Sequence, residues 1–130
     1  MNSTSQPQIQ LECPSVPASV TALRHRAAEF AIEQGAGEQL VADVNLAVSE
    51  AVTNAVKYAE EAGGPGSIGL AAQAGGDWLE FRITDQGKDF GKGSNDGLGL
   101  GLAIIARLCD DLRIVQEGAG TTVLMRFSLR

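Results

Sequence analysis

The stretch VSEAVTNAVKYAE, residues 48–60, carries the pattern that decides the fold. Its valines and alanines recur at the spacing of one face of an α-helix, and the phase continues through the whole of residues 38–61. An apolar stripe of this length predicts a helix that packs against the core. Two polar residues, Glu50 and Asn54, interrupt the stripe, although a buried carboxylate or carboxamide is costly without partners.

Glu50 and Asn54 are four residues apart, so on a helix their side chains project only about 40° from each other. Their tips can therefore converge on one ligand. Asp43 and Lys57 fall near the same stripe. The alternative is an exposed polar stripe on an amphipathic helix, and this segment alone does not decide between the two.

The flanking patterns predict one domain of a two-layer α+β sandwich over residues 1–130, with a mostly antiparallel sheet and helices on one face. Its polar start, residues 1–7, is expected to be frayed. The predicted elements are a strand at 8–15, a helix from Pro17 to the glycines Gly35 and Gly37, the helix 38–61, strands 67–73 and 77–85, a glycine-rich loop 86–97, a helix 100–111, and strands 112–117 and 121–130.

Composition narrows the classes of partner. The net charge is −6 and the isoelectric point ≈ 4.6, which argues against electrostatic capture of nucleic acid or an anionic membrane. With no long apolar run and no signal pattern in MNSTSQPQIQ, the sequence predicts a cytoplasmic protein. Cys13 and Cys109 are predicted to be reduced, packed thiols, and a single histidine gives a zinc or iron site no support.

The strand DWLEFRITD ends in a second candidate residue. Alternation places Leu79, Phe81, Ile83 and Asp85 on one face, which puts Asp85 in phase with the core. An inward aspartate at the end of a strand suits the floor of a pocket, where its carboxylate accepts a hydrogen bond from a ligand amine. The alternative is an aspartate that starts a turn, with Gly87 completing it.

The third candidate is the segment DGLGLGLAII, in which Gly97, Gly99 and Gly101 alternate with Leu98 and Leu100 at the start of a helix. Glycines there leave backbone N–H groups open, and the positive end of the helix favours an anion such as a phosphate chain. The spacing matches neither the dinucleotide fingerprint nor a Walker A loop. Glycines also serve as hinges, so this segment by itself is a weak signal.

The order of SEAVTNAVKYA, ITDQGKDF, GLGLGLAIIARLCDDL and GTTV resembles the GHKL superfamily of ATP-binding domains, from about residue 40 to the end. The short length and the leading strand and helix look most like the free-standing bacterial anti-sigma factor serine/threonine kinases. The resemblance implies the Bergerat ATP-binding fold, with ATP and Mg²⁺ as cofactors. It also assigns roles to individual residues.

By that resemblance Glu50 is the glutamate that acts as a base or positions the nucleophile, and Asn54 is the magnesium-ligating asparagine. Lys57 stands where some histidine kinases keep a phosphate-contacting basic residue, although a surface lysine is equally compatible with the sequence. Asp85 matches the aspartate that binds the exocyclic amine of adenine, and Gly87 matches the glycine beside it.

The glycine segment matches the family's second glycine box, which lies against the phosphates; its members here are Gly97, Leu98, Gly99, Leu100 and Gly101. Thr121 matches a threonine near the adenine, and alternation with Val123 points it inward. There are two departures. Asp89 replaces the second glycine of the usual Asp-x-Gly-x-Gly box at the start of the lid, and Tyr58 stands where histidine is common.

The resemblance implies a protein serine/threonine kinase that phosphorylates a STAS-type anti-anti-sigma factor and sequesters a sigma factor, and it admits a homodimer. One alternative is an ATP-binding module that sequesters a protein partner without phosphotransfer. Another is the detached catalytic domain of a sensor histidine kinase. His25 is a poor phosphoacceptor for that reading, because LRHRAAEF lacks the acidic and proline context of such sites.

Overall fold

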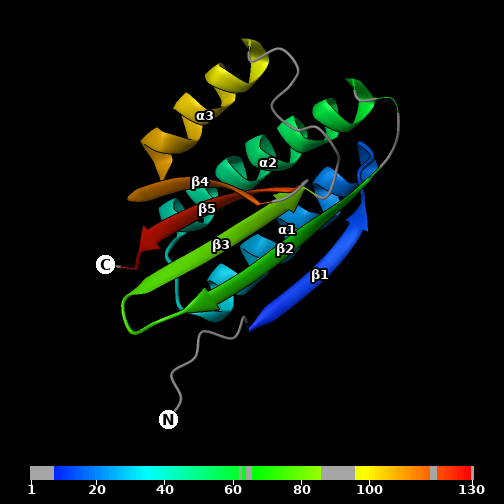
Figure 1. Cartoon of the computed structure of the whole chain (residues 1–130). Helices are drawn as coiled ribbons and strands as arrows, with labels where there is room; N and C mark the ends of the chain where they lie inside the picture. Colours follow the sequence, from blue (N-terminus) through cyan, green and yellow to red (C-terminus); the bar gives the residue numbers. More distant parts are fainter. Residues whose placement is uncertain (1–7, 62, 64–65, 86–95, 118–119, 130) are drawn as a thin grey trace.

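The chain folds as the predicted α+β sandwich, with three helices packed on one face of a five-stranded sheet (Figure 1). These elements come from a computed structural model that describes residues 8–61, 63, 66–85, 96–117 and 120–129, without the side chains of 61, 96–100 and 117. The predicted frayed start at residues 1–7, and the positions Gly87 and Asp89, lie outside the described residues.

The sheet has the strand order β1-β2-β3-β5-β4, and every neighbouring pair is antiparallel. Its strands are β1 (Ile9–Pro14), β2 (Ser67–Ala74), β3 (Trp78–Asp85), β4 (Asp111–Glu117) and β5 (Gly120–Ser128). β2 and β3 form the predicted hairpin, whereas β5 inserts between β3 and β4. This insertion places the end of β3 beside the start of β5, with Asp85 directly opposite Thr121.

The helical layer consists of α1 (Ala18–Glu33), α2 (Glu38–Glu61) and α3 (Asp96–Leu108), and α2 packs against both of the others. Pro17 precedes α1 as its cap residue, and Gly35, with φ of 92°, ends it in the left-handed region that glycine tolerates. α2 has the bounds expected from its apolar stripe. None of the described helices is long and apolar enough to cross a membrane.

The prediction for α3 was wrong at both ends. The helix begins at Asp96 rather than residue 100, so Gly97 and Gly99 lie inside its first turns. It ends at Leu108 because the chain joins the sheet there. The amide of Asp110 donates a 2.8 Å hydrogen bond to the carbonyl of Arg126, and β4 follows at once. Pairing with β5 thus takes residues 109–111 out of the predicted helix.

The predicted alternation along β3 is confirmed for the face that meets the helices. Leu79, Phe81 and Ile83 are buried, and so is Asp85. The ring of Phe81 makes edge-to-face contacts with Phe30 of α1, at 6.0 Å between centroids, and with a phenylalanine of β5 at the same distance. These contacts fix the sheet against the helical layer and hold the end of β3 in place.

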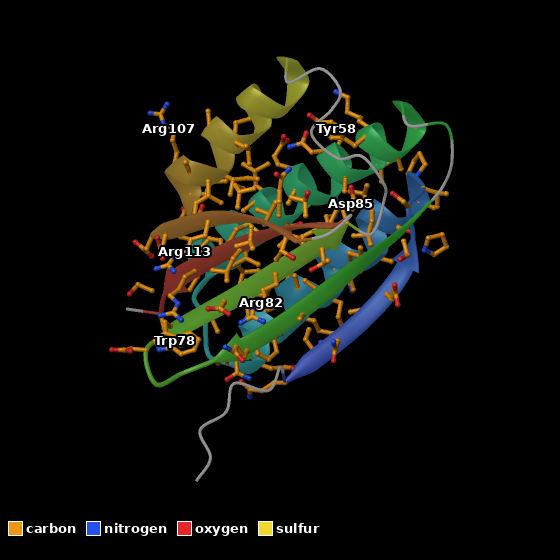
Figure 2. The ribbon with its side chains drawn as sticks, in the orientation of Figure 1. Tyr58, Trp78, Arg82, Asp85, Arg107 and Arg113 are labelled. Atoms are coloured by element: carbon orange, nitrogen blue, oxygen red, sulfur yellow. The ribbon has the colours of Figure 1, made fainter. Side chains whose placement is uncertain are left out.

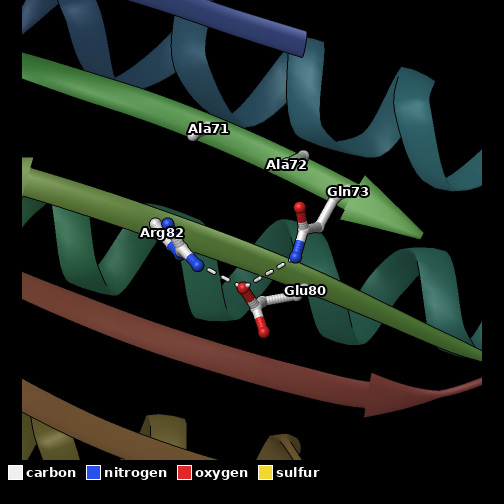
Figure 3. Close-up of a pocket in the computed structure, with 5 residues that line it drawn as sticks. All are labelled: Ala71, Ala72, Gln73, Glu80 and Arg82. Carbon is white, nitrogen blue, oxygen red and sulfur yellow. Dashed lines mark hydrogen bonds and ion pairs between the residues drawn. The ribbon is translucent and has the colours of Figure 1, made fainter. Parts of the chain in front are cut away.

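The opposite face of the sheet carries a buried charge that alternation alone does not predict. Glu80 is 3% exposed, although it points away from the helices (Figure 3). Its carboxylate accepts hydrogen bonds from Arg82 at 3.1 Å, Arg126 at 2.9 Å and Gln73 at 3.4 Å. Arg126 also stacks 4.2 Å from the centre of the Trp78 ring, at the far end of β3 from Asp85 (Figure 2). The cluster covers the outer face of three adjacent strands.

Glu80→Gln is expected to lower the free energy of unfolding by about 1–2 kcal/mol, because the two half-exposed arginines lose the charge they share. Urea unfolding followed by circular dichroism measures this. Glu12→Gln is the matched control, since Glu12 is an exposed glutamate on the same face. A loss for Glu80→Gln no larger than for the control would contradict a stabilising role for the cluster.

Both cysteines are free and half-buried, which agrees with their predicted packing as thiols. Burial raises the pKa of Cys109 above its usual value of 9.0, because the thiolate is poorly solvated beside the end of α3. A neutral thiol is a weak nucleophile, so this cysteine is expected to be a packing residue.

Candidate functional site

Three residues singled out from the sequence meet at one cavity between the helices and the sheet. Asn54 from α2, Asp85 at the end of β3 and Thr121 at the start of β5 all line one small cavity. Asp85 lies at the end of β3 opposite to the one that carries Trp78 (Figure 2). The insertion of β5 beside β3 is therefore what assembles the polar part of the cavity.

Two of these side chains carry buried polar atoms without a partner. Asn54 is 9% exposed and Thr121 is 2% exposed. Neither the Asn54 Nδ2 atom nor the Thr121 Oγ1 atom has a hydrogen-bond partner among the described residues. Such atoms cost free energy and are rare in native proteins. Their presence in one cavity makes this cavity the candidate for a ligand site.

Asp85 and Thr121 face the cavity because strand alternation points them inward. Asp85 is 4% exposed, which confirms its predicted phase with the core. The next threonines along, Thr84 and Thr122, point to the opposite face, where their hydroxyls lie 3.0 Å apart and share a hydrogen bond. A register shift of one residue would exchange the two pairs of side chains between the faces.

The rest of the cavity wall is apolar, and its members were not recognised as site residues from the sequence. They are Ala51, Ala55, Ile83, Leu102 and Val123. Apolar walls around a few polar groups are typical of a pocket for a small organic ligand. The available signal was the pair of alanines that flanks Asn54 on α2, which the helical pattern assigns simply to the core.

The other residues predicted for the site lie on α2 and α3 near the cavity, or outside the described residues. Glu50 is half-buried one turn before Asn54, and Lys57 is exposed; neither is among the residues that line the cavity. Gly97, Leu98, Gly99 and Leu100 form the start of α3, so backbone N–H groups of its first turn are available to an anion. Gly101 is buried against the carboxamide of Asn54. Gly87 lies outside the described residues.

A larger hollow of ≈ 790 Å³ lies over β1 and β2 on the open face of the sheet. It exists because small residues, Gly69 and Ala71, leave room between the neighbouring strands. Among the described residues, its lining includes no buried polar atom without a partner. This hollow is the larger of the two, but the unpartnered buried polar atoms lie in the cavity at Asn54. We therefore take the cavity at Asn54 as the candidate site.

Comparison with known proteins gives this fold and cavity a class. The sequence profile of the histidine kinase-like ATPase domain matches residues 13–127. The antiparallel sheet, the helices on one face and the cavity between them have the architecture of GHKL ATP-binding domains. The chain belongs to the histidine kinase-like ATPase family, in the branch of the anti-sigma factor serine/threonine kinases.

Curated relatives in that branch are similar over most of their length. The serine-protein kinase RsbW of Bacillus licheniformis is 32% identical over 133 residues, which cover 90% of this chain and 82% of that protein. The RsbW protein of Listeria innocua serovar 6a is 28% identical over 140 residues, with 95% and 89% covered.

Solved structures agree with the fold. The RsbU and RsbW domains of Rv1364c from Mycobacterium tuberculosis superpose with a TM-score of 0.72 at 26% identity. The match covers 95% of this chain and 32% of that one, so the chain spans about a third of that longer protein. The SiaB–SiaC complex from Pseudomonas aeruginosa has a TM-score of 0.69 at 14% identity, over 93% of this chain and 89% of that one, and shows the shared fold alone.

Proposed function

We propose that the chain is an ATP-dependent serine/threonine protein kinase that acts as an anti-sigma factor. The observation that carries the proposal is the pair of unpartnered buried atoms, Asn54 Nδ2 and Thr121 Oγ1, in one cavity with Asp85. A nucleotide provides a planar ring for the apolar walls and polar atoms for these groups. The relatives named serine-protein kinases support transfer of a phosphoryl group to a protein hydroxyl.

In this proposal the residues on the sheet side of the cavity bind the adenine base. The carboxylate of Asp85 accepts a hydrogen bond from the exocyclic amine of adenine, and the hydroxyl of Thr121 completes the polar contacts. Gly87 corresponds to the glycine that accompanies this aspartate in the family. The carboxamide oxygen of Asn54 is a hard ligand of the kind that Mg²⁺ prefers. When bound, Mg²⁺ neutralises charge on the phosphates. Lys57 at the surface of α2 adds a positive charge for the same phosphates.

The glycine segment and Glu50 act at the other end of the nucleotide. The start of α3, over Gly97, Leu98, Gly99 and Leu100, offers backbone N–H groups and a positive helix end to the phosphates. The serine hydroxyl of the substrate attacks the γ-phosphorus, and the bond to the β–γ bridging oxygen breaks to release ADP. The carboxylate of Glu50 accepts the hydroxyl proton or orients that hydroxyl.

The proposed partners follow from the family branch. The phosphoacceptor is a STAS-type anti-anti-sigma factor, and a sigma factor is the protein held when that antagonist is phosphorylated. A sigma factor as partner implies a cytoplasmic location, and a homodimer is a compatible assembly. The net charge of −6 suits a partner rich in basic residues.

Incubation of the purified protein with γ-labelled ATP, Mg²⁺ and the product of a neighbouring antagonist gene tests the reaction. The expected result is label on a serine or threonine of the antagonist. An unlabelled antagonist that still binds the protein would favour the alternative, a sequestering module without phosphotransfer. Label on a histidine of the chain itself would instead favour a histidine kinase.

Asp85→Asn is expected to weaken ATP binding by about 1–3 kcal/mol, because the amine of adenine loses a charge-assisted hydrogen bond. Calorimetric titration with ATP measures the change. Asp77→Asn is the matched control, since Asp77 is exposed in the turn at the opposite end of β3. Unchanged ATP affinity in a folded Asp85→Asn protein would count against the adenine role.

A further inference from the structure

At the candidate site, α3 meets Asn54 of α2 through a residue without a side chain. A Cβ atom placed on Gly101 would lie 2.5 Å from Asn54 Nδ2, 3.1 Å from Oδ1 and 3.2 Å from Cγ. A separation of 2.5 Å is shorter than real carbon contacts allow, and all three atoms belong to one carboxamide. With the carboxamide of Asn54 in this orientation, the backbone of α3 can lie against it because position 101 is glycine.

The position of Gly101 within α3 gives it a different role from the glycines before it. It is the sixth residue of the helix Asp96–Leu108. Only the first few N–H groups of a helix lack an intrahelical partner, so the N–H of Gly101 is expected to bond within the helix. Gly97, in the first turn, keeps a free N–H for an anion. A direct hydrogen bond to phosphate thus explains Gly97 but not Gly101.

The side chain that Gly101 contacts is itself part of the candidate site. Asn54 is 9% exposed and lines the cavity together with Ala51 and Ala55. A methyl group at position 101 would force one of two changes. Either the carboxamide rotates, or α3 moves outward and takes with it Leu102, which lines the same cavity. Both changes alter the site that the proposed Mg²⁺–nucleotide would occupy.

We propose that Gly101 is a positioning residue, whose missing side chain lets α3 press on the carboxamide of Asn54 and fix its orientation toward the metal. The inference rests on the proposed function for the identity of the ligand. The contact itself does not depend on it. Gly101 therefore acts through Asn54 and needs no direct contact with the nucleotide.

A double-mutant cycle tests this role. It compares the wild type with Gly101→Ala, Asn54→Ala and the double variant, first by ligand binding and then by thermal unfolding. Binding of a fluorescent ATP analogue is measured with Mg²⁺ and with EDTA. Gly101→Ala is expected to reduce the affinity gained from Mg²⁺ by at least about tenfold, as loss of a supporting contact to a metal ligand does. Its affinity in EDTA is expected to stay near that of the wild type, and in the Asn54→Ala background it should have no further effect.

The second measurement follows thermal unfolding without nucleotide. Gly101→Ala is expected to lower the melting temperature of the wild type but to raise that of Asn54→Ala, where the clash is absent and alanine favours the helix. If Gly101→Ala does not fold, recovery of folding in the double variant would likewise show that the clash with Asn54 causes the loss of stability. Gly69→Ala is the control, since its Cβ would lie 3.8 Å from the carbonyl oxygen of Leu11, which is an ordinary van der Waals contact.

The outcomes separate this inference from the proposed function. Additive effects in both measurements, or unchanged Mg²⁺ dependence in Gly101→Ala, would overturn the positioning role while leaving ATP binding in place. A wild type that binds no ATP would overturn the proposed function. In that case the unfolding measurements still test whether Gly101 contacts Asn54. Non-additive effects of the two substitutions on the melting temperature would support the contact, and additive effects would contradict it.

Discussion

Glu50→Ala is expected to slow transfer of phosphate to the antagonist by about 10²–10⁴-fold, the range for loss of a general base. Glu50 is half-buried on α2, one turn before Asn54, and does not line the cavity that would hold the base. Its removal should therefore act on the chemical step rather than on nucleotide binding. Single-turnover labelling of the antagonist, with saturating protein and ATP, measures the step directly.

Glu60→Ala is the matched control for Glu50→Ala, because Glu60 is an exposed glutamate on the same helix. The control should transfer phosphate at the wild-type rate, and both variants should still bind ATP and the antagonist. Wild-type transfer by Glu50→Ala would rule out its assigned role. Loss of antagonist binding would show that the glutamate serves the protein interface instead.

Asn54→Ala is expected to abolish the Mg²⁺ dependence of ATP binding, and with it phosphotransfer. The reason is chemical, because alanine offers no oxygen to the metal. The fold should survive, since the wild-type carboxamide already has an unpartnered nitrogen whose burial is costly. ATP titrations in Mg²⁺ and in EDTA measure the first effect, and thermal unfolding measures the second.

Asn45→Ala serves as the control for Asn54→Ala, as it removes a half-buried carboxamide from the same helix. Its Mg²⁺ dependence should match that of the wild type. Equal Mg²⁺ dependence in Asn54→Ala and the wild type would discard the metal role of Asn54. The same result would remove the basis for the positioning role of Gly101.

The elements that could be predicted from the sequence are those with strong internal periodicity. α2 has the predicted bounds because its apolar stripe runs from end to end. β3 has the predicted inward face, down to Asp85, because alternation is a local property of a strand. The same reasoning placed Thr121 inward. These local patterns fixed the faces on which the site residues lie.

Features that depend on contacts between distant segments could not be predicted in this way. The end of α3 is set by the bond from Asp110 to Arg126 of β5, which is invisible to helical spacing. The burial of Glu80 requires partners from β2 and β5. The contact of Gly101 with Asn54 likewise depends on how two helices pack. Local spacing singled out Gly101 and Asn54 without showing that they meet.

A crystal structure with Mg²⁺ and a non-hydrolysable ATP analogue is the most direct test of the central claim, that the cavity between α2, α3 and the sheet is the ATP site. We predict the adenine amine on the carboxylate of Asp85, the metal on the carboxamide of Asn54, and the phosphates at the start of α3. Nucleotide density at any other place, with no ligand in the cavity lined by Asn54 and Thr121, would contradict the claim.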